Sequence, residues 1–349
     1  MSEFQEIVIK RPIDFHGHLR EGDLLSKVVG HSNLYDKVVA MGNLSSPVIS
    51  GRQAQAYQKE IIESGAKFEP IMSIMMTRDI TTASLYDAYA HGVRVLKLIP
   101  GGTSTGSGQG ISLKDLIKYY DVLKFAEELG MIFSGHWELI SEYGRDIPEI
   151  QRECRAIPHL LDVIRNFQKL KIIVEHISTE AMVDLVIRTP KNVAATVTGH
   201  HLGPFSQRDV FCSKDGVVRN SALYCKPPLK SLMDVYCVKQ AALNGGSKVF
   251  FGSDSAPHWP HTKEFPRPNA GIFAPAEVVL PWIWSVFESD GKKPKDFERF
   301  TSIAGAEFYG IPVSEESLTM TRGEWQVPGS YDGFVPFLAG RKLDWKIVG

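Results

Sequence analysis

Short apolar runs alternate with longer amphipathic stretches along the chain, and this rhythm restricts the possible folds more than any other feature. Eight runs are rich in β-branched and aliphatic residues: Ile13–His16, Lys37–Met41, Phe68–Met75, Val93–Leu98, Met131–Ser134, Lys171–Glu175, Val193–Val197 and Lys248–Gly252. Parallel strands that are covered on both faces have this near-continuous apolar character. We therefore expect eight buried parallel strands.

Helix-like segments lie between most of these runs: Ser50–Ser64, Ser112–Leu129, Pro158–Gln168, Thr179–Ile187 and Ser231–Asn244. Strands that alternate with helices indicate an α/β fold, and eight such units predict a (β/α)8 TIM barrel. A doubly wound open sheet is the alternative. That fold usually has a glycine-rich turn after its first strand, and the sequence has none at this place.

The length of 349 residues fits one barrel domain that spans 1–349, because α/β barrels of this size commonly form a single unit. Residues from about 313 to 349 are expected to form a short C-terminal tail packed on the barrel. Short strands are expected in this tail, including the stretch DGFVPFLAG.

Charge and composition argue against several classes of function. The formal net charge is −1, so the chain has no positive field that would attract nucleic acid. No stretch approaches the roughly 20 apolar residues that span a bilayer, and the N-terminus lacks the apolar core of a signal peptide. The four cysteines form no C-x-x-C pair, which favours reduced thiols in a cytoplasmic protein.

Polar residues that suit metal binding stand at the ends of several predicted strands. In such barrels the active site lies at the carboxyl ends of the strands. His16 and His18 end the first strand, and residues i and i+2 of a strand point the same way. The other candidates, at the ends of the fourth, fifth, sixth and eighth strands, are Lys97, His136, His176 and Asp254. Imidazole and carboxylate groups at one rim predict a site for zinc or a similar divalent ion.

Each of these residues alone has an ordinary structural explanation. A histidine near a strand end can pack or cap, and a lysine such as Lys97 can extend to the surface. Asp254 can cap the helix that follows it. The conjunction of six such residues at one end of separately predicted strands favours the metal site.

The motifs DFHGHLREGD, VLKLIPGGTSTGSGQG, SGHWE, VEHIST and FFGSDSAPH occur in this order. In order and spacing the chain resembles a dihydroorotase of the amidohydrolase superfamily, and is most similar to the shorter bacterial type. The resemblance extends from about Arg11 to the C-terminal VPFLAG.

The resemblance implies a binuclear site with two zinc ions (Zn²⁺) per chain. His16, His18 and Asp254 would hold one ion, and His136 and His176 the other. Lys97 would be carboxylated by CO₂, and its carbamate would bridge both ions. A hydroxide shared by the two metals would attack the amide carbonyl, with Asp254 as the catalytic base and then acid.

The implied reaction is the reversible cyclisation of N-carbamoyl-L-aspartate to L-dihydroorotate with loss of water, the third step of de novo pyrimidine biosynthesis. A homodimer is common in the family. Two alternatives stay open at this point: another cyclic-amide hydrolase, such as a dihydropyrimidinase or allantoinase, and a scaffold protein that has lost catalysis.

The resemblance also assigns residues that bind the substrate. Arg20 matches a carboxylate-binding arginine, and Asn43 matches a substrate-binding asparagine, although a surface arginine and a turn residue are their ordinary explanations. The remaining matches are His258, the backbone near Ala270, the main chain of Leu223, and the hydroxyls of Ser104 and Thr105.

Ser104 and Thr105 belong to the glycine-rich segment Gly101–Gly110, which is expected to act as a lid over the substrate. A phosphate-binding loop is the competing interpretation, but the G-x-x-x-x-G-K-[ST] pattern is missing. At the end of the seventh predicted strand, Gly199 replaces a more usual proline, and His200 is additional to the family's usual histidine at His201.

Overall fold

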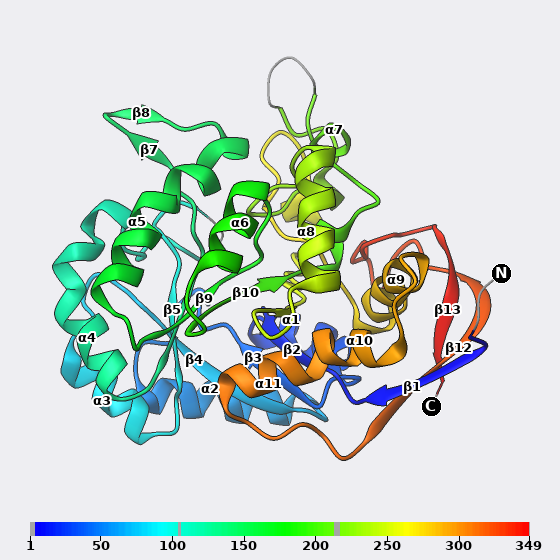
Figure 1. Ribbon diagram of the computed structural model, residues 1–349, viewed down its shortest axis with the longest axis horizontal. Coiled ribbons are helices and arrows are strands. Elements are labelled where there is room, and N and C mark those ends of the chain that lie inside the picture. Colours follow the sequence, from blue (N-terminus) through cyan, green and yellow to red (C-terminus); the bar gives the residue numbers. More distant parts are fainter. Residues whose placement is uncertain (1–3, 104–105, 213–216, 349) are drawn as a thin grey trace.

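The computed structural model describes residues 4–103, 106–212 and 217–348 (Figure 1). Eight parallel strands form a barrel: β2 (Ile13–Gly17), β3 (Lys37–Ala40), β4 (Glu69–Met75), β5 (Val95–Leu98), β6 (Ile132–Gly135), β9 (Lys171–Val174), β10 (Val193–Val197) and β11 (Val249–Phe251). They pair in the order β11-β10-β9-β6-β5-β4-β3-β2. The first and last strands meet at their carboxyl ends, where the N–H of Asp254, three residues past β11, donates to the carbonyl of His16 in β2 at 2.8 Å. The predicted barrel and its eight strands are confirmed.

Helices surround this barrel on its outer side, as Figure 1 shows. The longer ones are α2 (Gly51–Glu63), α3 (Thr82–Ala90), α4 (Tyr120–Glu128), α5 (Arg152–Asn166), α6 (Glu180–Arg188), α8 (Leu232–Asn244) and α9 (Ala276–Ser289). The five predicted helices are present, and two were not predicted, α3 and α9. In α9 the residues are apolar almost all round, so the helix has no polar face to reveal its period. No helix in the described part of the chain is long and apolar enough to cross a membrane.

Apolar side chains fill the lower part of the barrel interior. The cluster comprises Ile13, Phe15, Val39, Met41, Val95, Ile132, Ile173, Ala194 and Phe250 from the barrel strands and their ends. The short helix α11 (Ala304–Tyr309) completes it with Ala304, Ala306 and Phe308. Because the strands are parallel, all their carboxyl ends lie at one end of the barrel. The apolar cluster fills the opposite end, so a polar site can form only at the carboxyl end.

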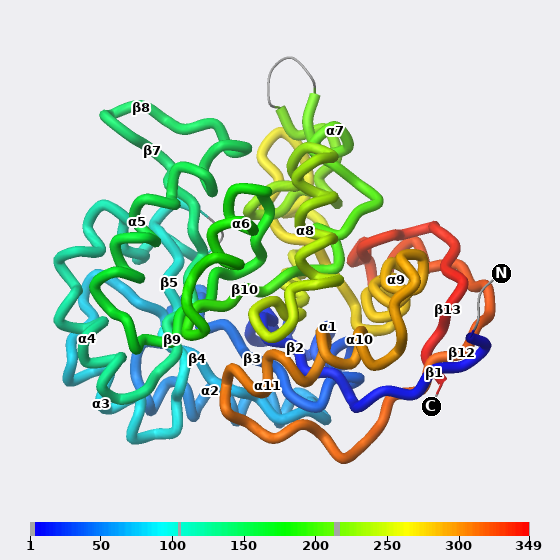
Figure 2. Tube along the Cα trace, in the orientation of Figure 1, coloured from blue at the N-terminus to red at the C-terminus, as the bar shows by residue number. Residues whose placement is uncertain are grey.

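The two ends of the chain form a separate three-stranded antiparallel sheet. Strand β1 (Glu6–Lys10) pairs with β12 (Ser317–Gln326), which pairs with β13 (Lys342–Val348). Figure 2 shows these N- and C-terminal segments side by side, next to α9. Trp345 of β13 packs edge-on against Trp284 of α9, with ring centroids 5.8 Å apart.

The prediction of a strand within DGFVPFLAG is wrong. Residues 332–340, in the connection from β12 to β13, form turns and isolated β-bridges and no strand. Asp332 and Leu338 have φ angles of 49° and 62°, in the left-handed region that interrupts an extended strand. That residues 1–349 make a single domain stays a prediction.

Candidate metal centre and substrate pocket

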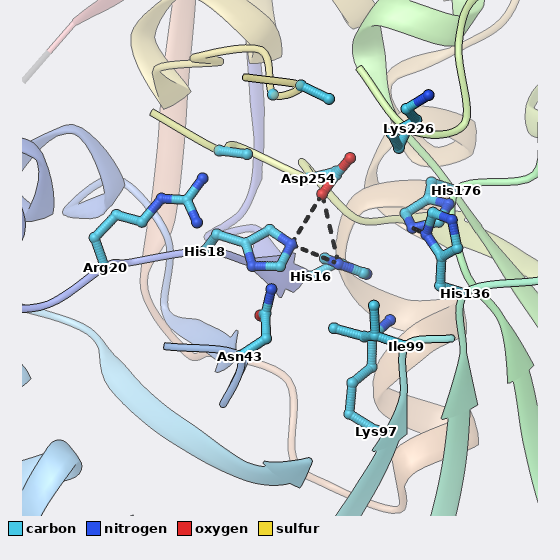
Figure 3. Close-up of a pocket in the computed structure, with 13 residues that line it drawn as sticks. His16, His18, Arg20, Asn43, Lys97, Ile99, His136, His176, Lys226 and Asp254 are labelled. Atoms are coloured by element: carbon cyan, nitrogen blue, oxygen red, sulfur yellow. Dashed lines mark hydrogen bonds and ion pairs between the residues drawn. The ribbon is translucent and has the colours of Figure 1, made fainter. Parts of the chain in front are cut away.

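The first group of ligand candidates joins the end of β2 to Asp254, three residues past the end of β11. His18 Nε2 lies 3.2 Å from Asp254 Oδ1, and His16 Nε2 lies 3.6 Å from the same oxygen. The two histidine Nε2 atoms are 3.3 Å apart. Figure 3 shows the three side chains converging. These spacings allow the three side chains to share one cation.

Asp14 explains why the ends of β2 and β11 are held together. Its carboxylate accepts the His16 N–H at 3.0 Å, the Ser253 N–H at 2.7 Å and the Ser253 hydroxyl at 2.5 Å. Burial raises the pKa of Asp14 to about 7, although these hydrogen bonds oppose the rise. Asp14 and Ser253 were not predicted as site residues, and they act by positioning their neighbours.

Glu175 orients the ring of His16 from below the site. His16 Nδ1 lies 2.7 Å from Glu175 Oε2, so Nδ1–H donates and the Nε2 lone pair points to Asp254 and His18. Thr196 donates to the same carboxylate oxygen at 2.6 Å, and the Ser134 hydroxyl donates to the other. Burial opposes ionisation, but the charges of His16 and Lys97 and these hydrogen bonds lower the pKa of Glu175 to about 2.

The second group is the pair His136 and His176. His136 Nε2 lies 2.8 Å from Glu138 Oε2, which makes Nε2 the donor and leaves the Nδ1 lone pair free. That Nδ1 accepts a hydrogen bond from His176 Nε2 at 3.1 Å. The two rings therefore face each other with ring nitrogens converging, as imidazoles do when they share a cation.

Two of the ligand candidates have strained backbone conformations. The φ angles are 40° for His176 and 45° for Asp254, in a region that costs roughly 1–3 kcal/mol for such residues. Thr196 Oγ1 accepts the His176 N–H at 2.7 Å and holds this conformation. Strain of this kind persists at functional sites because the surrounding structure fixes it.

Lys97 lies between the two groups and is 1% exposed. Its Nζ is 3.9 Å from Glu175 Oε1 and makes no hydrogen bond within the described part of the chain. Burial lowers the pKa of Lys97, although Glu175 and Asp254 oppose this. A buried amine without a hydrogen bond is costly. Four imidazoles, a carboxylate and this amine form a donor set that fits a divalent metal site.

These residues line one pocket at the carboxyl end of the barrel (Figure 3). Its walls are His16, His18, Arg20, Asn43, Lys97, Ile99, His136, His176, Lys226, Asp254, Ala256, Ala270 and Gly271. The Arg20 Nε–H donates to the Pro257 carbonyl at 2.8 Å, and an Nη lies 3.2 Å from His258 Nε2. Burial lowers the pKa of Arg20 only to about 10, so it stays a cation.

The structure brings together most of the residues predicted to bind substrate. Arg20, Asn43 and Ala270 line the pocket, and His258 stands behind them, 2.9 Å from the Ala270 carbonyl. Leu223 is buried but is not among the lining residues of this pocket.

Lys226, three positions after Leu223 in the same loop, lines the pocket instead. Its ammonium points away from Asp254 in Figure 3 and pairs with Glu149. Ser104 and Thr105 lie outside the described residues.

No protein-family model matches the chain. Among known proteins, the dihydroorotase of Alkalilimnicola ehrlichii is 34% identical over 99% of this chain and 100% of its own length. The dihydroorotase of Coxiella burnetii is 35% identical over 98% of each chain.

Solved structures agree with these relatives. A Saccharomyces cerevisiae dihydroorotase in complex with 5-fluoroorotic acid has a TM-score of 0.89, 28% identity and 99% coverage of both chains. A Campylobacter jejuni dihydroorotase gives 0.87 and 28%, covering 100% of this chain and 98% of its own. An L-hydantoinase from Arthrobacter aurescens shares the fold at 15% identity. The chain belongs to the dihydroorotase family of the amidohydrolase superfamily.

Proposed function

We propose that this chain interconverts N-carbamoyl-L-aspartate and L-dihydroorotate, with loss of water on ring closure, as the third step of de novo pyrimidine biosynthesis. The observation that carries the proposal is one pocket lined by four histidines, Asp254, the buried Lys97 and the cationic Arg20. The same pocket thus combines donors for metals with a partner for a carboxylate.

Two zinc ions are the proposed cofactors. His16, His18 and Asp254 would hold one ion, and His136 and His176 the other. Lys97 would be a ligand to both as its carbamate, since a bare ammonium has no lone pair, and its Nζ has no other hydrogen bond among the described residues. Bound ions would polarise the amide carbonyl and acidify a water near neutral pH.

Asp254 is the proposed proton carrier. In ring opening it accepts the proton of the attacking water and returns it to the ring nitrogen as the amide C–N bond breaks. In ring closure the same carboxylate moves the proton in the opposite direction. Asp254 Oδ1 lies 3.2 Å from His18 Nε2, and the carboxylate faces the histidines of the pocket in Figure 3. This position beside the proposed ligands supports the role of proton carrier.

Arg20 is the proposed partner of the substrate carboxylate, which a guanidinium binds with charge-assisted hydrogen bonds. Burial lowers the pKa of His258 to about 3, so its ring is neutral and adds no charge beside Arg20. The backbone carbonyl of Arg20 accepts a hydrogen bond from the Tyr57 hydroxyl at 2.7 Å, which holds the backbone of Arg20 in place. Asn43 is proposed to bind the ring from the facing wall.

The glycine-rich segment Gly101–Gly110 is proposed to close over the ligand, with Ser104 and Thr105 supplying hydroxyls. A Cβ on Gly106 would lie 2.7 Å from the Asn43 carbonyl, so this segment passes directly against the pocket wall. Leu223 is proposed to contact the ring through its main chain, beside Lys226, which lines the pocket. A homodimer and a cytoplasmic location stay predictions.

The test compares substrates that differ in the carboxylate. Wild-type protein purified without chelator should open dihydroorotate, and should act poorly on dihydrouracil and hydantoin, which lack the carboxylate. Arg20→Met should lower kcat/KM for dihydroorotate about 100-fold or more, the cost of a lost charged contact. The matched control is Arg208→Met, which lies away from the pocket. Preference for dihydrouracil or hydantoin would instead assign the chain another cyclic amide.

A further inference from the structure

A second cluster of metal-ligating side chains lies beyond the end of β10, outside the set that the proposed reaction uses. His200 and His201 belong to the short helix Gly199–Leu202, and Cys225 lies in the loop before α8. One donor atom from each of the three lies within 4.8 Å of the other two, and all three side chains are buried.

His200 is the residue of this cluster whose ring nitrogens have no hydrogen-bond partner within the described part of the chain. It is 0% exposed. Its ring centroid lies 4.7 Å from that of His201 and 6.1 Å from that of Phe337. Burial, with His201 beside it, lowers the pKa of His200 well below its ordinary value, so the ring keeps a free lone pair. Buried polar groups are nearly always hydrogen-bonded, so this one needs an explanation.

His201 and Cys225 point at a common place. His201 Nε2 lies 3.3 Å from the Pro227 carbonyl oxygen, and Cys225 Sγ lies 3.2 Å from the same oxygen. His201 Nδ1 is 2.8 Å from Thr198 Oγ1. In this structure Nε2–H donates to the Pro227 carbonyl, and Nδ1 accepts a hydrogen bond from the Thr198 hydroxyl. A cation bound at Nε2 would replace that proton, and Nδ1–H would then donate to Thr198, the arrangement typical of a metal-ligating histidine.

We propose that His200, His201 and Cys225 form a further metal site, for a thiophilic cation such as Zn²⁺. Two imidazoles and a thiolate are ligands that zinc and its soft analogues prefer. On binding, the Cys225 thiol releases its proton to solvent as the metal–sulfur bond forms, with no change in oxidation state. This site is independent of the proposed reaction.

Such a site has a structural consequence for the catalytic pocket. Cys225 is the neighbour of Lys226, which lines that pocket, while His200 and His201 follow a barrel strand. A bound cation would fasten the pocket-wall loop to the barrel rim.

The test is a titration of the chelator-treated full chain with Cd²⁺ alone, following the ultraviolet thiolate-to-cadmium charge-transfer band. The ligand candidates of the catalytic pocket include no cysteine, so the band reports only a cysteine site. We expect a band that saturates at one Cd²⁺ per chain, within a total of three. His200→Phe and Cys225→Ser should each lose the band and one equivalent and keep the other two. Cys154→Ser, at an exposed cysteine, is the control and should change neither.

A single-cysteine variant decides the case even if the buried substitutions prevent folding. Replacing Cys154, Cys212 and Cys237 by serine leaves Cys225 alone, and the band should persist. Absence of a band in the wild type, its loss in the single-cysteine variant, or its survival in folded Cys225→Ser would overturn the proposal. Failure of the catalytic site would look different, since the total would fall to one equivalent while the band remained.

Discussion

The barrel interior has two layers that lie two residues apart on the same strands, and they differ completely in chemistry. The lower layer includes Val95, Ile132, Ile173 and Ala194, all in the apolar interior cluster. Two positions further along the same four strands, or just past their ends, the residues are Lys97, Ser134, Glu175 and Thr196, all buried. Residues i and i+2 share a strand face, so both layers point inward. One alternation therefore supplies the core at one end of the barrel and the site at the other.

The two layers also differ in what they do for stability. Burying an aliphatic side chain of the lower layer contributes about 1.5–3 kcal/mol. Charges in the upper layer must be paired to be tolerated, since an unpaired buried charge is strongly destabilising. Glu175 meets this demand by contacting His16, Thr196 and Ser134. Lys97 has only the ion pair with Glu175 at 3.9 Å, and its Nζ makes no hydrogen bond within the described residues. The lower layer holds the barrel together, and the upper layer is arranged for ligands.

The largest expected effect is at the site itself. Asp254→Asn should lower kcat for dihydroorotate about 10⁴-fold, because the residue is both a proposed ligand and the proposed proton carrier. Steady-state kinetics with metal analysis of the same sample measures it. The matched control is Asp79→Asn, an exposed aspartate whose loss should leave kcat unchanged. Near wild-type turnover in Asp254→Asn would remove Asp254 from the mechanism.

Glu175→Gln tests the upper layer without replacing a proposed ligand. The amide keeps the shape but loses the charge that orients His16, so metal affinity should fall about 10- to 100-fold. Competition with a chelator of known affinity measures this loss, and excess zinc should restore activity. If metal affinity stays unchanged, Glu175 serves stability and not the site.

Ile173→Ala makes the opposite change two residues away. It should lower the free energy of unfolding by about 2–5 kcal/mol, the cost of a cavity in a packed core. Metal content and kcat per folded molecule should stay the same, as urea unfolding and active-site titration would reveal. Ile187→Ala, on the partly exposed face of α6, is the control and should change stability by about 0.5 kcal/mol or less. Equal losses at both positions would contradict the layered description.

The smallest expected effect is that of Thr196→Val, which changes shape very little. It removes one hydrogen bond to Glu175 and one from the His176 N–H, so stability should fall by about 1–3 kcal/mol. Metal affinity should fall less than in Glu175→Gln. A larger loss of metal in Thr196→Val would make the threonine, and not the carboxylate, the main support of the ligands.

The sequence predicts the fold and the ligand candidates well because both follow from periodicity. Eight apolar runs mark eight strands, and a polar residue that ends such a run lies at the barrel's carboxyl rim. Glu175 escaped notice because an acidic residue beside His176 also fits a solvated strand end, and only the three-dimensional contacts show it buried.

Segments whose sequences show no regular hydrophobic period were harder to predict. The helix α9 is apolar on nearly every face, and the small sheet of β1, β12 and β13 pairs residues from opposite ends of the chain. Leu223 ends the short 3-10 helix Ser221–Leu223 and Lys226 lies in the loop after it, where spacing along the chain does not determine which residue lines the pocket. His200 is a single imidazole whose missing partners become visible only in the folded chain.

Removal and return of the metals tests the central claim most directly. Metal content and the rate of dihydroorotate opening are measured on one sample before chelation, after it, and after adding zinc with bicarbonate. We expect about two metals per chain together with turnover before chelation. Metal content and turnover should be lost together on chelation and should recover together, with the fold retained throughout as judged by circular dichroism. Full turnover by the metal-free chain would contradict it, as would a folded chain that binds no metal at this end of the barrel.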